Sequence, residues 1–188
     1  MVSAGKLFRL EERMPLSLIA EKLKDWRAER VEKCGEQEFK LVSEIVDLDF
    51  REDLLWGVFL EDKLIPTTYR GKLRCNLSTR SSSFFFTEAG GETLLFVMEK
   101  WRLANNIASK LAEILLRPGG ILEATISHEV LRELHESNPE ATKVIYFDQV
   151  DLPNINKLAL YGEALSDTGL YHEYLKHGKI WYLSLIHI

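Results

Sequence analysis

Alternation of apolar and polar positions dominates the first half of the chain. It is clearest in residues 38–50, where one side of a predicted strand carries Phe39, Leu41, Ser43 and Ile45. Residues 54–66 predict two further strands that reverse at Glu61-Asp62-Lys63. Residues 83–101 predict a hairpin that turns at Gly90-Gly91, since paired glycines supply the positive φ angles of a tight turn. A period of two over so long a stretch favours an antiparallel sheet.

Two segments of the same half carry the helical period instead. The first helix is predicted over residues 18–34, with an N-cap at Ser17 and a stop at Gly35. Its apolar stripe consists of Ile19, Leu23 and Trp26. A second helix is predicted over residues 102–116. Its buried side consists of Leu103, Ile107, Leu111, Ile114 and Leu115.

The sequence RPGG at residues 117–120 ends the second helix and is the best internal boundary. A short strand follows it, and then a third helix with Ser127 as its N-cap. The residues of that helix expected to face inward are Val130, Leu131 and Leu134. A strand leading into YFDQVD, a short helix ending near Gly178 and a last strand, KIWYLSLI, complete the pattern.

These elements predict an α+β fold with two subdomains that meet near Gly119-Gly120. Residues 1–118 are expected to form an antiparallel sheet covered by two helices. Residues 119–188 are expected to form a smaller α/β subdomain.

Composition narrows the class of protein. The 188 residues are 46% hydrophobic, and a net charge of −5 excludes a chain-wide basic footprint for nucleic acid. No stretch approaches the ~20 apolar residues of a membrane span, and the N-terminus lacks the apolar core of a secretory signal. The only cysteines are Cys34 and Cys75, with no CxxC motif. Two lone thiols predict a reducing compartment and hence a cytoplasmic protein.

The segment Thr68–Ser83 holds a local excess of positive charge. It contains no Asp or Glu, and its candidate ligand-binding residues are Tyr69, Arg70, Lys72, Arg74 and Arg80. Cations and hydroxyl groups contact phosphates, and an aromatic ring stacks on a base. The segment therefore predicts either a loop that approaches an anionic ligand such as nucleic acid or a solvated loop whose cations balance neighbouring carboxylates. We prefer the solvated loop for the segment taken by itself, because charge patterning alone does not specify a ligand, and we expect Cys75 to be an ordinary thiol.

Acidic residues at a strand end provide a second candidate site. Asp148 and Asp151 follow a predicted strand, and Glu163 comes after them. Such carboxylates are the Mg²⁺ ligands of metal-dependent hydrolases and nucleases. The alternative is an Asx-turn at Asp151 before Leu152-Pro153-Asn154. We prefer the turn, because no spacing specifies a further ligand.

Other signatures of catalysis are missing from the sequence. It contains no GxSxG, GxxxxGK[ST] or GxGxxG motif. His128 and His135 are seven residues apart on one predicted helix, too far for a helical pair of metal ligands, and His172 and His177 flank a helix end. We therefore expect surface or partly buried histidines, no cofactor and no catalytic residue.

Three stretches carry a resemblance to a known group: VMEKWRLANNIASKLAEIL, LHESNPEATKVIYFDQVDLPNINKLALYGEAL and YHEYLKHGKIWY. They resemble a group of archaeal conserved hypothetical proteins, over roughly residues 8–182. The resemblance implies a shared fold and an archaeal origin. It implies no catalytic residue, because the group has no assigned activity.

The last six residues, LSLIHI, are also the translation of CTG TCT CTT ATA CAC ATC. That is the mosaic-end adapter of transposase-based sequencing libraries. The match covers all six residues and predicts a native chain cut near Tyr182, with Ile180, Tyr182 and Leu183 in an edge strand. The alternative is a genuine buried strand that ends at His187-Ile188.

Taken together, these patterns favour a non-enzymatic binding or interaction protein that contacts an anionic ligand through the basic segment. The expected partners are nucleic acid or another protein, and no membrane. A metal-dependent hydrolase or nuclease and a structural subunit of a complex are the alternatives. Convergence of Asp148 and Asp151 beside Glu163 in one cleft would favour the enzyme, and an exposed apolar patch would favour the subunit.

Overall fold

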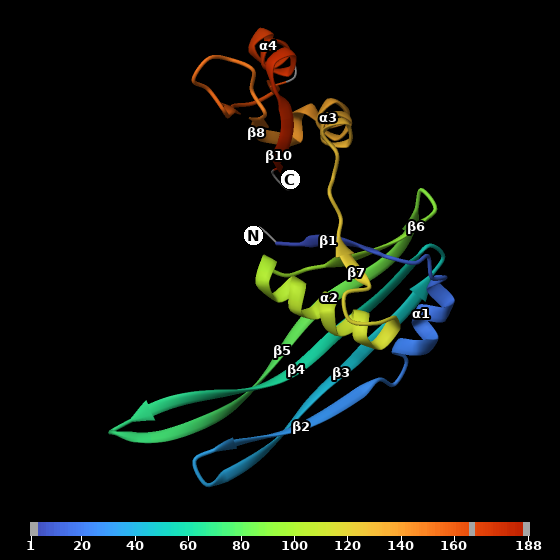
Figure 1. Cartoon of the computed structure of the whole chain (residues 1–188), viewed down its shortest axis with the longest axis vertical. Helices are drawn as coiled ribbons and strands as arrows, with labels where there is room; N and C mark the ends of the chain where they lie inside the picture. Colours follow the sequence, from blue (N-terminus) through green and yellow to red (C-terminus); the bar gives the residue numbers. More distant parts are fainter. Residues whose placement is uncertain (1–3, 166–167, 186–188) are drawn as a thin grey trace. The chain divides into compact units, whose positions relative to one another are not determined.

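The computed structural model describes residues 4–165 and 168–185 (Figure 1). The chain divides into two compact units between Ala124 and Thr125. Both units combine antiparallel strands with helices, so the predicted α+β class is confirmed. Within the described residues, no helix is long and apolar enough to cross a membrane.

A seven-stranded antiparallel sheet forms the first unit. Its strands are β1 (Lys6–Leu10), β2 (Arg27–Cys34), β3 (Gln37–Arg51), β4 (Leu54–Tyr69), β5 (Lys72–Ala89), β6 (Glu92–Val97) and β7 (Ile121–Glu123). The strand order is β2-β3-β4-β5-β6-β1-β7, so the middle of the chain forms a continuous meander. The hairpin predicted at Gly90-Gly91 is confirmed, with φ angles of 60° and 82° at the two glycines.

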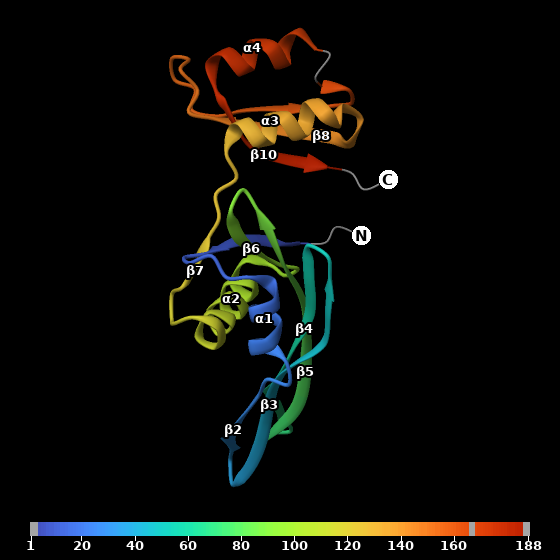
Figure 2. The same cartoon turned by 90° about the vertical axis from the view of Figure 1, so that its right-hand side faces the viewer.

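Two helices, α1 (Leu16–Leu23) and α2 (Trp101–Leu115), cover one face of this sheet (Figures 1 and 2). α1 begins directly after Pro15, before the predicted cap at Ser17. The core between helices and sheet includes Phe8, Ile19, Leu23, Leu55, Phe59, Phe84, Phe86, Leu95, Val97 and Leu111. Burial of so many large apolar side chains is the main force that holds the helices to the sheet.

The buried side of α2 agrees closely with the prediction. Ile107, Leu111 and Leu115 are buried, whereas Leu103 and Ile114 are only partly buried. The reason is the small side chains in the centre of the buried face, which are Ala104, Ala108 and Ala112. They let the helix backbone lie close to the sheet, and the larger residues flank that row.

The helix predicted over residues 18–34 is wrong beyond Leu23. Asp25 adopts a positive φ of 54° and the chain then enters β2. All but the last residue of β2 are exposed, so this charged stretch has no apolar face that would hold a helix to the core. Its backbone pairs with β3 along its whole length, and ion pairs such as Lys40 with Glu29 cross between the strands.

The turn predicted at Glu61-Asp62-Lys63 is also wrong, because β4 continues through it. In the register of β4 with β5, Glu61 lies opposite Arg80. The chain reverses instead at Arg70-Gly71, whose φ angles of 49° and 73° are those of a tight hairpin turn. The segment 68–83, expected to be a loop, is therefore the end of a long hairpin.

The predicted subdomain boundary at Gly119-Gly120 lies before the observed division. The sequence assigns the short strand after RPGG to the second subdomain. In the structure this strand is β7, which pairs with β1 and places Leu122 opposite Arg9. Its hydrogen bonds extend the first sheet, so the chain leaves the first unit only after Ala124.

The second unit is a smaller antiparallel sheet with two helices. Its elements are α3 (His128–Ser137), β8 (Thr142–Asp148), β9 (Leu158–Tyr161), α4 (Gly169–His177) and β10 (Lys179–Leu185). The strand order is β10-β8-β9, with every pair antiparallel. Its core consists of Ile145, Phe147, Leu160, Leu165, Tyr171 and Ile180.

The last strand is an edge strand, as predicted. β10 pairs only with β8 among the described strands, and Leu183 lies opposite Ile145. The pairing continues through Ser184 and Leu185, which are the second and third residues of the LSLIHI sequence that matches the adapter. Residues 186–188, with His187, lie outside the described part of the chain.

The N-cap predicted for α3 is confirmed, but its inward face is not. Val130 is 54% exposed and Leu134 is 41% exposed, whereas His135 is fully buried. The His135 ring packs edge-on against the ring of Tyr171, with the centroids 4.9 Å apart. Leu131 packs against the core as expected. Contact with an aromatic ring therefore replaces an aliphatic contact at the centre of this helix.

Cys34 and Cys75 are joined in a disulfide, so the expectation of two lone thiols is wrong. β3 and β4 pair only up to Ser43 and Glu61, and beyond this point the sheet splits into two arms. We call them the β2–β3 arm (residues 27–42) and the β4–β5 arm (residues 62–79). The disulfide joins the arms with a Cα–Cα distance of 6.3 Å. No local motif signals it, because the cysteines are 41 residues apart.

Candidate functional site

The carboxylates considered as metal ligands have separate partners. Asp148 accepts the N–H of the next residue at 2.9 Å through one oxygen and lies 3.9 Å from Nζ of Lys157 through the other. The Oδ1 atom of Asp151 lies 2.8 Å from Nδ1 of His177, and Glu163 pairs with Lys143 at 2.7 Å. Among the described residues, no three His, Cys, Asp or Glu side chains form a group that could hold a metal ion. The three carboxylates therefore do not converge in one cleft, and the Asx-turn at Asp151 stays a prediction, because the contact shown for its side chain is the one with His177.

Strand alternation arranges the basic segment. Arg74 and Arg80 are both even-numbered residues of β5, so they lie on the face that carries the buried phenylalanines of that strand. Arg70 occupies the hairpin turn. The backbones of Tyr69 and Lys72 pair to close the turn, while their side chains lie outside the described part of the structure.

Cations from three other elements join Arg80 on this face. Lys63 comes from β4, Lys110 from α2 and Arg30 from β2. Lys63, Arg80 and Lys110 line one hollow between α2 and the sheet, and Arg30 reaches the same place from the β2–β3 arm. We call Arg30, Lys63, Arg74, Arg80 and Lys110 the basic face.

Glu61 is the carboxylate at the centre of the basic face. It forms ion pairs with Lys110, with Lys63 at 3.1 Å and with Arg30 at 3.5 Å, and its side chain is only 15% exposed. Burial by itself raises the pKa of Glu61, but the hydrogen bonds from Lys110 and Lys63 outweigh burial and lower it. Glu61 is therefore charged at neutral pH and holds three cations in place.

Positive charge nevertheless exceeds negative charge around Glu61. Of the residues that line the hollow, Glu61 is the one carboxylate beside Lys63, Arg80 and Lys110, and Arg30 pairs with both Glu61 and Glu32, the latter at 3.1 Å. Lys63 and Lys110 keep about a third of their side-chain surface exposed. The ammonium groups are thus fixed in position and still accessible to an anion, which is the arrangement that lowers the entropic cost of binding.

Asp62 fixes the point where the arms separate. Its side chain accepts the O–H of Thr79 at 2.7 Å and the N–H of Val42 at 3.0 Å. These two hydrogen bonds lower the pKa of Asp62, and that of Thr79 contributes most. The carboxylate thereby replaces the sheet hydrogen bond that β3 loses as it leaves β4.

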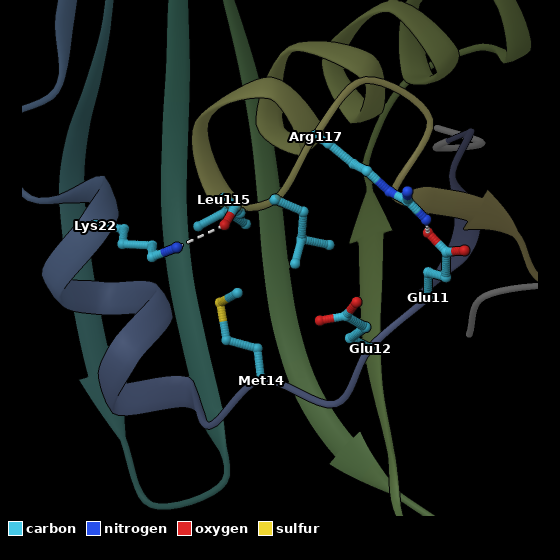
Figure 3. Close-up of a pocket in the computed structure, with 7 residues that line it drawn as sticks. Glu11, Glu12, Met14, Lys22, Leu115 and Arg117 are labelled. Atoms are coloured by element: carbon cyan, nitrogen blue, oxygen red, sulfur yellow. Dashed lines mark hydrogen bonds and ion pairs between the residues drawn. The ribbon is translucent and has the colours of Figure 1, made fainter.

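A separate hollow of about 320 Å³ lies beside the end of α2 (Figure 3). Two of the cations that line it, Lys22 and Arg117, have partners beside the hollow. Lys22 donates to the carbonyl of Leu115 at 2.7 Å, and Arg117 pairs with Glu11 at 2.7 Å. A cation at the last carbonyls of a helix stabilises its C-terminus. We assign Lys22 this structural role.

Sequence reasoning missed three of the five cations, namely Arg30, Lys63 and Lys110. A signal was present for Lys63, because Phe59, Glu61 and Lys63 continue one alternating face once β4 is recognised as a single strand. No local signal in the sequence predicts that Lys110 joins them, because it lies 49 residues from its partner Glu61.

Comparison of the sequence with models of known protein families gives no match, and comparison with curated proteins gives none.

Proposed function

We propose that this protein binds nucleic acid through the basic face of its first unit. The observation that carries the proposal is the meeting of four cations, Arg30, Lys63, Arg80 and Lys110, around one largely buried carboxylate, with Arg74 farther along the same face of β5. The sugar–phosphate backbone is the polyanion whose evenly spaced charges fit such a row. Arg74 and Arg80 are six residues apart on one strand, about 20 Å at the usual strand rise. That length spans several successive phosphates.

Binding of this kind carries little sequence preference, because phosphate contacts position a protein without reading bases. The acidic net charge of −5 is compatible with it, since the field that attracts a polyanion is local to one face. The Cys34–Cys75 disulfide links the two arms that carry Arg30 and Arg74. It restricts their relative movement and so supports a preformed surface.

The test is fluorescence anisotropy with labelled single- and double-stranded oligonucleotides between 50 and 200 mM salt. The variant Arg74→Ala/Arg80→Ala should weaken binding, and on duplex DNA it should reduce the salt slope by about 1.8 if each arginine neutralises one phosphate. The matched control is Arg27→Ala/Lys40→Ala. It removes the same charge from exposed positions whose ion pairs, to Glu29, lie outside the basic face.

No binding by the unaltered protein at 50 mM salt would refute the proposal. So would an equal loss of affinity in the two double variants, because a general charge effect then explains the result.

A protein partner is a second candidate, favoured by one observation. Leu73 and Leu77, the odd-numbered leucines of the β4–β5 arm, are 58% and 52% exposed, and Val31 on the β2–β3 arm is 62% exposed. Exposed apolar side chains on both arms are typical of an interaction surface. A structural subunit of a complex would bury them. Light scattering of Leu73→Ser/Leu77→Ser in the presence and absence of cell extract tests whether a larger assembly depends on these residues.

We keep the cytoplasmic location as part of the proposal. A disulfide is rare in most cytoplasmic proteins, but intracellular proteins of hyperthermophilic archaea form them commonly. The archaeal resemblance therefore reconciles the disulfide with that location.

A further inference from the structure

The second unit contains a hollow of about 310 Å³ with an unusual set of charges. It is lined by three permanent cations, Arg132 of α3, Lys176 of α4 and Lys179 of β10. His128 and His177 also line it, and the only carboxylate among its lining residues is Asp151. A hollow of this size suits a small ligand, and the excess of positive charge selects an anion.

The single carboxylate is already engaged. The Asp151 carboxylate accepts from Nδ1 of His177 across 2.8 Å, and the backbone N–H of Asp151 donates to the carbonyl of His177 at 2.9 Å. These two contacts join the end of α4 to the segment after β8. They hold the carboxylate of Asp151 against the imidazole ring.

The cations are less constrained by partners of their own. Arg132 approaches Glu136 only through Nε, at 3.7 Å, and about half of its side-chain surface is exposed. Lys179 is exposed at the start of β10, and the carboxylate near it is Glu129, which also pairs with His128 at 3.0 Å. A guanidinium fork and an ammonium on two different elements form the usual pair of contacts for a phosphate group. α3 begins at this hollow with His128, and the positive end of a helix adds to the same field.

We propose that this hollow binds a phosphate group, with Arg132 and Lys179 as its charged contacts. The proposal rests on the second unit alone and does not depend on nucleic-acid binding by the basic face. The chemistry recognised is the phosphate dianion, whether free or at the end of a nucleotide.

Two-dimensional NMR of the full chain, titrated with inorganic phosphate, adenosine 5′-monophosphate and adenosine, tests it. Both phosphates should give saturable shifts in amides of residues 128–132 and 176–180, and adenosine should give none. Equal affinity for the two phosphates identifies a free-phosphate site, and a preference for the nucleotide identifies a phosphoester site. Both results support the proposal.

Arg132→Ala and Lys179→Ala should each weaken phosphate binding at least tenfold. The matched control is Lys157→Ala, an exposed lysine of the same unit that does not line the hollow. No saturable shift in the unaltered protein, equal displacement by chloride, or an equal effect of Lys157→Ala would overturn the proposal.

Discussion

Replacement of Leu111 by Ala tests whether α2 is held to the sheet by burial. Leu111 is fully buried in the core of the first unit, on the same helix face as Ile107 and Leu115. The helix has no side-chain cap at its N-terminus, so its packing is the main source of its stability. Truncation of a fully buried leucine loses the transfer free energy of the side chain and leaves a cavity.

The expected cost is about 3–5 kcal/mol, in the upper part of the range for such substitutions, because a hydrogen-bonded sheet collapses poorly into a cavity. With a urea slope of about 2 kcal/mol per molar, the unfolding midpoint should fall by roughly 1.5–2.5 M. Tryptophan fluorescence is the assay. Trp181→Phe is used as the background, because Trp181 is the one tryptophan in the second unit and its removal restricts the signal to the first.

The matched control is Leu77→Ala, the same substitution at a leucine that is 52% exposed on β5. It should cost less than about 1 kcal/mol, since half of the side chain is already in water. An unchanged midpoint for Leu111→Ala, or equal shifts for the two variants, would show that α2 does not depend on this contact.

Three further predictions concern other parts of the structure. Burial holds the pKa of His135 below its ordinary value of 6.5. Below about pH 6.5 the unfolded chain therefore takes up a proton that the folded chain does not, and the free energy of unfolding of the second unit should fall as the pH drops. Both ring nitrogens of His135 are buried without a hydrogen-bond partner. His135→Leu should therefore stabilise the second unit by about 1–3 kcal/mol and abolish this pH dependence, and hydrogen exchange of the β8 amides measures both effects. Lys22→Met removes the ammonium that caps Leu115 and should cost about 1–2 kcal/mol in urea unfolding, whereas no change would exclude the capping role. Cys34→Ser/Cys75→Ser opens a loop of 41 residues and should lower the free energy of unfolding by about 4 kcal/mol through chain entropy. Two reactive thiols in the unreduced, denatured protein would contradict the disulfide.

Short-range order in this protein could be read from the sequence. Alternation over residues 39–45, the Gly90-Gly91 turn and the buried face of α2 are each set by burial with a fixed period, and each is confirmed. Beyond Val46 an irregularity at Asp47, with a φ of 52°, interrupts the alternation. The wrong assignments fall where charge interrupts that period. Residues 27–34 carry no apolar stripe, and Glu61 and Asp62 inside β4 have the composition of a turn.

The tertiary structure alone decided how charges and thiols from distant segments meet. Arg80 was visible in the sequence, but its neighbours Lys63 and Lys110 join it only because β4 is one strand and α2 packs across it. The pairing of Cys34 with Cys75 depends on the splitting of the sheet into two arms. The physical reason is that hydrophobic periodicity acts between near neighbours in sequence, whereas ion pairs and disulfides form between atoms that folding brings within a few ångströms.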